Sequence, residues 1–237
     1  RVLFRSKYIA EPFLGLSQGL GAVLIVTVFV QIFWFFGIHG PNVLAPVLEG
    51  IWGQAQLINI DIFQKGYEGK TGTAAVLAAI DDGKAYMWVR GSFDAFAWFG
   101  GSGGTIVLII AILLFSKRAD YLTVGKLSLG PGIFNINEPI MFGLPVVLNP
   151  IMFIPFVIAP LVATTIGWVA TYLGLVAPVS QQVAWVTPPL LLSFLATGAD
   201  WRAPIVALVC MVVTFLIWTP FVIAANKMDP ALGESEQ

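Results

Sequence analysis

The sequence has 237 residues, of which 58% are hydrophobic and 11% are charged, and its formal net charge is −1. Soluble domains carry about 25% charged residues, so this composition argues against a soluble globular fold. The near-neutral charge also argues against a nucleic-acid partner, because it leaves no basic surface for a phosphate backbone.

Four long windows without a charged side chain indicate membrane-spanning helices. They cover 12–38, 95–116, 139–199 and 203–226. A helix needs about 20 apolar residues to cross a hydrocarbon core, and each window reaches that length or nearly so. Polarity does not alternate along them as it does along the strands of a membrane β-barrel. The sequence therefore predicts an all-α polytopic membrane protein with about five spanning helices and two re-entrant hairpin regions.

The first predicted span covers 14–38 and ends in the aromatic stretch WFFGIHGPN. The next region, 41–97, is semi-polar, and none of its apolar pieces spans a bilayer alone. Half-spanning or non-helical backbone persists at membrane depth only where protein or a watery cavity covers it. We interpret 41–97 as a re-entrant hairpin or a structured loop near one interface.

A further span is predicted at 101–116, followed by the basic residues Lys117, Arg118 and Lys126. The positive-inside tendency places this basic end in the cytoplasm. The glycines at 100–104 match neither the dinucleotide pattern nor the P-loop pattern, so they do not predict a phosphate-binding loop.

Prolines recur in the second half of the chain, and they exclude one long regular helix there because proline removes a backbone donor and clashes with the preceding turn. The expected elements are a broken re-entrant segment at 131–147, spans at 150–175 and 205–225, a polar interruption at 177–189 and a polar tail at 227–237. The whole chain, 1–237, is expected to form one membrane transport domain. It starts with Arg1 rather than Met, and we expect it to be an N-terminally truncated fragment.

Glu138 is the strongest candidate for a functional residue. It lies in FNINEPIMFG, and the sequence from 139 to 199 that follows contains no ionisable Asp, Glu, Lys, Arg or His. A carboxylate within a membrane segment costs at least about 2.5 kcal/mol and is a functional-site hypothesis by default. Pro139 disfavours helix at Glu138, which predicts unwound backbone there, with Asn135 and Asn137 as neighbouring polar groups. The alternative is an interfacial loop carboxylate in water.

His39 is the second candidate, and Trp34 lies about one helical turn before it. His39 is predicted either to contact a substrate in a cavity or to cap a helix end at the interface. Carbohydrate sites combine aromatic rings with carboxylate, amide and imidazole groups, as these residues would. Trp185 and Thr187 repeat the aromatic-plus-polar pattern at the later interruption, although Trp185 also suits an interface anchor.

No metal or cofactor is expected. The only histidine and the only cysteine, Cys210, are far apart and do not form a zinc-binding set. Cys210 is interpreted as a small apolar residue that packs within the bilayer.

Three stretches resemble a known family. GIFNINEPIMFGLPVVLNPIMFIPFVIAP, FFGIHGPNVLAPVLE and FDAFAWFGGSGGT are similar to the membrane permease component, enzyme IIC, of bacterial sugar phosphotransferase systems. The similarity is to the lactose, cellobiose and N,N′-diacetylchitobiose group. It runs from about 14 to 226 and covers only the C-terminal half of a full permease.

This resemblance implies an elevator-type transport domain in the bacterial cell membrane, with two re-entrant hairpins and a homodimer in the full-length protein. It implies a β-linked disaccharide substrate, phosphorylated by enzyme IIB, which is itself supplied by enzyme IIA. Glu138 then binds the sugar 6-hydroxyl or acts as its base, and His39, Asn137 and Trp34 are further sugar contacts. Trp185 is a further candidate, and Cys210 does not match the phosphorylated cysteine, which belongs to enzyme IIB.

Two other classes remain as alternatives. A proton-coupled secondary sugar transporter would use Glu138 as its protonatable group. A structural membrane anchor would not need a carboxylate at a helix break.

Overall fold

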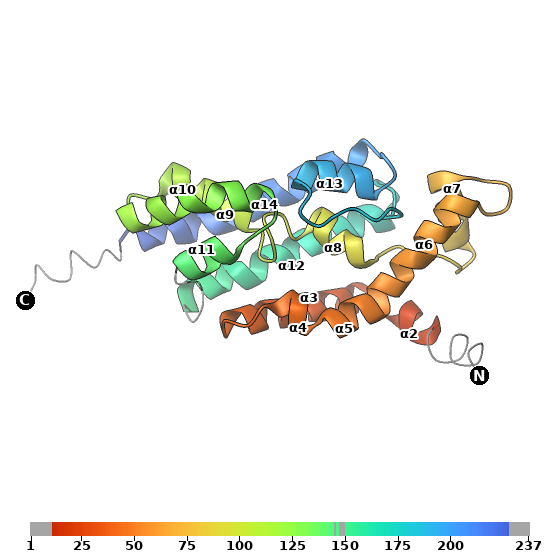
Figure 1. The fold of residues 1–237 in the computed structure, drawn as a ribbon, viewed down its shortest axis with the longest axis horizontal. Helices are drawn as coiled ribbons and strands as arrows, with labels where there is room; N and C mark the ends of the chain where they lie inside the picture. Colours follow the sequence, from red (N-terminus) through yellow and green to blue (C-terminus); the bar gives the residue numbers. More distant parts are fainter. Residues whose placement is uncertain (1–10, 145, 147–149, 228–237) are drawn as a thin grey trace, which may run out of the picture.

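The computed structural model describes residues 11–144, 146 and 150–227 (Figure 1). Within these ranges the regular structure is helical, apart from one isolated β-bridge between Tyr67 and Lys70. The predicted all-α class is therefore confirmed for the described part of the chain. The predicted polar tail lies outside it, except for Lys227.

Two of the described helices are long and apolar enough to cross a membrane. They are α12 (Pro150–Tyr172), from Met152 onward, and α14 (Arg202–Ala225). They coincide with the predicted spans at 150–175 and 205–225, and they pack against each other along their length. These two helices support the membrane class, while the total of about five spans remains a prediction.

The other two predicted spans are shorter helices. The region 14–38 is divided between α2 (Glu11–Leu16) and α3 (Leu20–Phe35), and the region 101–116 contains α9 (Thr105–Phe115). At about 1.5 Å per residue, neither α3 nor α9 reaches the roughly 30 Å of a hydrocarbon core. Spacings of three and four residues place the buried side chains of α3 on one face, which packs on α12.

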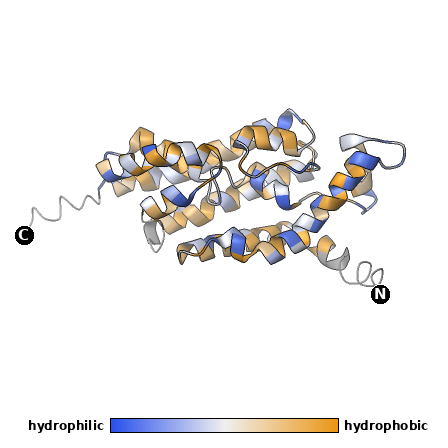
Figure 2. Cartoon of the chain, in the orientation of Figure 1, coloured by the Kyte–Doolittle hydropathy of each residue, from blue (hydrophilic) through white to orange (hydrophobic). Residues whose placement is uncertain are grey.

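The semi-polar region after α3 is a series of helical pieces. They are α4 (Gly40–Val43), α5 (Ala45–Val47), the π-helix η2 (Leu48–Gly53), α6 (Gln54–Lys65) and α7 (Gly72–Asp81). Helices α6 and α7 pack on each other and project from the rest of the molecule (Figure 1). Hydrophilic residues are more frequent on α6 than on α9 (Figure 2). This region is structured, as predicted, and its depth in a membrane remains a prediction.

Four further helices complete the described part of the chain. They are α8 (Arg90–Phe96), α10 (Ala119–Ile133), α11 (Glu138–Gly143) and α13 (Pro189–Ala196). Helix α9 packs between α10 and α14, and α13 packs on α8 and α14. The predicted polar interruption at 177–189 is irregular chain, in which the Ser180 and Gln181 amides donate to the carbonyl of Ala196.

The structure differs from the predicted broken segment at 131–147 in two places, at Pro131 and at Glu138. Pro131 is inside α10, and the first break lies at 134–137, where Asn135 has φ 61°. Helical structure ends again after Gly143. Glu138 is the first residue of α11 rather than part of the unwound backbone. The physical reason is that Pro139 falls in the first helical turn, where amide groups have no intrahelical acceptor and proline is favoured.

Candidate functional site

A cavity of about 260 Å³ lies where the break before α11 meets α4, α8 and the 177–189 loop. Five of the predicted site residues line it: His39, Asn135, Asn137, Glu138 and Trp185. Trp34 and Thr187 do not line it. We call this space the Glu138 cavity.

His39 and Glu138 approach each other at this cavity. The Nε2 atom of His39 lies 3.6 Å from Oε1 of Glu138, and the two side chains are 35% and 46% exposed. His39 Nδ1 accepts a hydrogen bond from the amide of Asn42 at 3.3 Å, so the proton of a neutral imidazole is on Nε2 and faces the carboxylate. The separation exceeds a direct hydrogen bond and allows a ligand hydroxyl to contact both groups.

The capping interpretation of His39 is confirmed, while its contact with a substrate remains a prediction. His39 is the N-cap of α4, and its other nitrogen faces the cavity. Gly40, directly after it, packs so closely that a Cβ atom would collide with the carbonyl of Val30 on α3. This close approach holds the start of α4, and with it the imidazole, against α3.

Trp34 packs against the ring of His39. Its side chain is buried, with a ring centroid 4.7 Å from that of His39 and 6.1 Å from that of Phe142 on α11. The predicted neighbourhood of Trp34 and His39 is thus present. In this structure Trp34 packs against the imidazole and does not reach the cavity surface.

The side chain of Asn135 connects three segments. Its Oδ1 accepts from the amide of Gly100 at 2.8 Å, and its Nδ2 donates to the carbonyls of Trp185 and Thr187 at 2.6 and 2.8 Å. Both N–H groups of the amide are therefore used, which makes Asn135 a positioning residue. Thr187 takes part through its carbonyl group.

Asn137 is held in a similar way. It is buried, and its Nδ2 donates to the carbonyl of Ser102 at 3.0 Å. Gly101 has φ 98°, and a Cβ atom there would lie 2.6 Å from Cγ of Asn137. Only glycine fits this approach, which explains the glycine-rich stretch before α9 without a bound phosphate.

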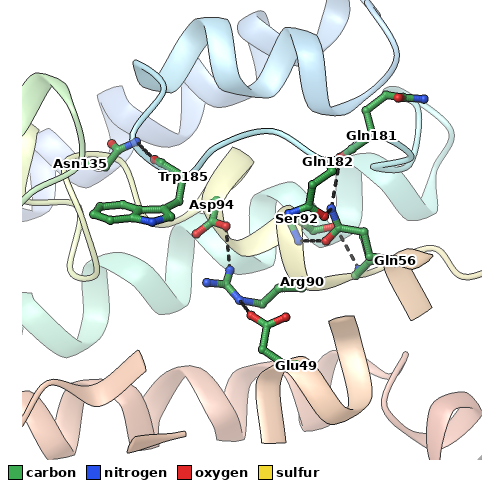
Figure 3. A network of polar contacts seen from close by, with 11 residues as sticks. Glu49, Gln56, Arg90, Ser92, Asp94, Asn135, Gln181, Gln182 and Trp185 are labelled. Atoms are coloured by element: carbon green, nitrogen blue, oxygen red, sulfur yellow. Dashed lines mark hydrogen bonds and ion pairs between the residues drawn. The ribbon is translucent and has the colours of Figure 1, made fainter. Parts of the chain in front are cut away.

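Arg90 and Asp94, two charged residues that the sequence reasoning missed, also line the cavity, and Glu49 pairs with Arg90 from outside it. Arg90 Nη1 lies 2.7 Å from Asp94 Oδ2, and Arg90 Nε lies 3.1 Å from Glu49 Oε1 (Figure 3). The Arg90 guanidinium also lies 4.9 Å from the ring centroid of Trp98. The i,i+4 spacing of Arg90 and Asp94 on one helix was the signal that could have identified the pair.

These groups can recognise a polyhydroxylated ligand. The cavity combines one imidazole, carboxylates, a guanidinium and the half-exposed indole of Trp185. Among the described residues, no three His, Cys, Asp or Glu side chains come together as a metal site.

Comparison with known proteins gives a consistent result. The model of the family described as "Phosphotransferase system, EIIC" matches residues 4–160. The cellobiose-specific EIIC component of Lactococcus lactis is 59% identical over 230 residues, covering 94% of this chain and 47% of that protein. The oligo-beta-mannoside-specific EIIC component of Bacillus subtilis is 36% identical over 230 residues, covering 97% and 48%.

A solved structure shows the same fold. The transporter ChbC, the IIC component from the N,N′-diacetylchitobiose-specific phosphotransferase system, aligns with a TM-score of 0.86 at 31% identity. The alignment covers 99% of this chain and 54% of ChbC. The chain thus spans about half the length of the relatives it matches. The family match and the shared fold confirm the resemblance read from the sequence motifs: the chain belongs to the EIIC family of the phosphotransferase system.

Proposed function

We propose that this chain is the sugar-binding and translocating part of a phosphotransferase-system permease for a β-linked disaccharide. The approach of His39 Nε2 to Glu138 Oε1 at 3.6 Å, within a cavity between helices, carries the proposal. A sugar hydroxyl between them would donate to the carboxylate and accept from the imidazole, which satisfies both of its hydrogen-bonding roles.

In this proposal the hydroxyl at Glu138 is the 6-hydroxyl of the substrate. The phosphocysteine of enzyme IIB supplies the phosphoryl group, so the S–P bond breaks and a P–O bond to the sugar forms. Glu138 binds the hydroxyl and accepts its proton as the new bond forms. Asn137 and Trp185 contact the sugar, while Trp34, Asn135 and Thr187 hold the contacting groups in place.

The proposal extends to architecture and location. Residues 1–237 act as one transport domain of an elevator in the bacterial cytoplasmic membrane, within a homodimer. The regions around α4–α7 and α10–α11 are its two re-entrant hairpins. Short helices that cannot span a bilayer alone, packed beside the two long apolar helices, support this arrangement.

Uptake into membrane vesicles tests the proposed function. Because the chain spans about half of its relatives, the assay uses a chimera in which it replaces the matching residues of the Lactococcus lactis cellobiose-specific relative. We expect cellobiose uptake that depends on phosphoenolpyruvate, enzyme IIB and the other soluble phosphotransferase proteins. Uptake driven by a pH gradient alone would instead establish a proton-coupled transporter.

A further inference from the structure

Three carboxylates and one guanidinium lie at the Glu138 cavity or directly beside it. Arg90, Asp94 and Glu138 line the cavity, and Glu49 pairs with Arg90 from outside it (Figure 3). Among the described residues that line this cavity, Arg90 is the only Lys or Arg. With a neutral imidazole at His39, the carboxylates therefore outnumber the positive charge, and the surroundings of the cavity are acidic.

The guanidinium of Arg90 is shared by two of these carboxylates. Its Nη1 donates to Asp94 Oδ2 at 2.7 Å, and its Nε donates to Glu49 Oε1 at 3.1 Å. The side chains of Arg90 and Asp94 are both only 18% exposed, so salt screens their charges less than it screens charges at an open surface. The one positive charge beside the cavity is thus compensated by two negative charges before any ligand arrives.

Glu49 reaches Arg90 from a different part of the fold. It lies in the π-helix η2, a rare helical form that is frequent at functional sites. A Cβ atom on Gly53, at the end of the same element, would lie 2.7 Å from Glu49 Oε2, so the glycine leaves room for the carboxylate. Glu49 does not line the Glu138 cavity. It can therefore act on a ligand there through its charge and through Arg90.

The charge of the sugar changes in the proposed reaction. A β-linked disaccharide is neutral, whereas a phosphate monoester carries about −1.5 to −2 charges at pH 7. Arginine is well suited to phosphate, because its planar guanidinium makes two parallel hydrogen bonds to the oxygens. An uncompensated Arg90 would therefore hold the phosphorylated product. Glu49 and Asp94 oppose this by balancing its charge and by occupying its Nε and Nη1 groups.

We infer that Glu49 is a specificity-determining residue, through which the Glu138 cavity accepts the neutral sugar and rejects the sugar 6-phosphate. The inference rests on the proposed function, which places the 6-hydroxyl, and hence the new phosphate, at Glu138. The carboxylates of Glu138, Asp94 and Glu49 repel the phosphate, and Arg90 carries no excess charge to retain it. Glu49 thus promotes release of the product without touching the sugar.

Calorimetric titration of the purified chimera with cellobiose and with cellobiose 6′-phosphate tests this role. We expect the unsubstituted chimera to bind cellobiose at least about 10²-fold more tightly than the phosphate. Glu49→Gln keeps an oxygen acceptor for Arg90 Nε but removes the charge. It should tighten binding of the phosphate about tenfold and leave cellobiose unchanged. In the phosphorylation assay with enzyme IIB, the same variant should be inhibited by cellobiose 6′-phosphate at about tenfold lower concentration.

The matched control is Glu68→Gln, which removes the same charge from an exposed turn that does not line the cavity and should alter neither affinity. Cellobiose binding reports that each variant is folded. Equal affinities of the unsubstituted chimera for the two ligands would overturn the role of Glu49 alone. An unchanged ratio of affinities in Glu49→Gln, or loss of cellobiose binding in that variant, would do the same. Absence of cellobiose binding in the unsubstituted chimera would overturn the proposed function and the role of Glu49 together.

Discussion

Asn135 donates a hydrogen bond of 2.6 Å to the backbone carbonyl of Trp185, which ties the helix break before α11 to the loop before α13. The same side chain accepts from the amide of Gly100. One amide group thus holds three segments together. They are the segment that carries Glu138, the glycine-rich segment before α9 and the segment that carries Trp185.

Replacing Asn135 should loosen this unit. Asn135→Gly removes its side-chain hydrogen bonds but tolerates the left-handed backbone at φ 61°, and we expect it to lower the free energy of unfolding by about 1–3 kcal/mol. Asn135→Ala should lower the free energy of unfolding by about 1–2 kcal/mol more than Asn135→Gly does, because alanine is strained in that conformation. Unfolding in detergent, followed by circular dichroism, measures both. Equal free energies of unfolding for the alanine and glycine variants would show that alanine is not strained at this position.

Glu138→Gln should leave folding and membrane insertion intact, since a neutral amide is no harder to bury than a carboxylate. Sugar phosphorylation should fall by at least 10²-fold, because the amide cannot accept the hydroxyl proton. The measurement is phosphorylation of cellobiose by the chimera with purified enzyme IIB. Glu68→Gln, in the exposed turn between α6 and α7, is the matched control and should keep full activity. Full activity of Glu138→Gln would exclude Glu138 as the base.

His39 allows its two roles to be separated. Asparagine is a good N-cap, so His39→Asn should preserve the stability of α4 while removing the imidazole that faces Glu138. His39→Ala removes both the N-cap acceptor and the imidazole. It should lower the free energy of unfolding by ~1 kcal/mol relative to His39→Asn. Sugar affinity from titration should fall in both variants by a similar factor, while thermal stability falls only in the alanine variant. Unchanged affinity in His39→Asn would show that the imidazole does not contact the sugar.

Asp200 should make stability depend on pH. Burial raises the pKa of Asp200, but hydrogen bonds from Arg202 and from the Ala177 amide outweigh burial and lower the pKa below its ordinary value of 3.8. A carboxyl group whose pKa is lower in the folded state than in the unfolded state stabilises the fold at pH values above its unfolded-state pKa. This stabilisation is lost as the pH falls through the folded-state pKa.

The matched variant for this effect is Asp200→Asn. Unfolding measured from pH 7 to pH 3 should show the wild type more stable at neutral pH, with the difference shrinking below about pH 4. A difference that stays constant across this range would show that the charge of Asp200 contributes nothing to the fold.

Several properties of this protein follow from its sequence by itself. The charge-free windows predict a helical membrane protein, because the thickness of a hydrocarbon core sets a length of apolar sequence that can be read directly from the chain. The isolated carboxylate Glu138 and the only histidine, His39, are identifiable as site candidates because burying either group is costly without a partner. The motifs around them identify the family, which the comparisons confirm.

Other properties depend on tertiary packing. Arg90 pairs with Glu49, and Gln56 bonds to Gln181 and Gln182, across sequence separations that no local pattern predicts. Trp34 lies behind His39 rather than at the cavity surface because α3 packs on α12 and α4 folds back against it. Glu138 begins a helix because Pro139 falls in its first turn, while the contacts of Asn135 hold the break just before it. Sequence periodicity reports local burial, whereas these arrangements are selected by long-range hydrogen bonds and by which helices share a face.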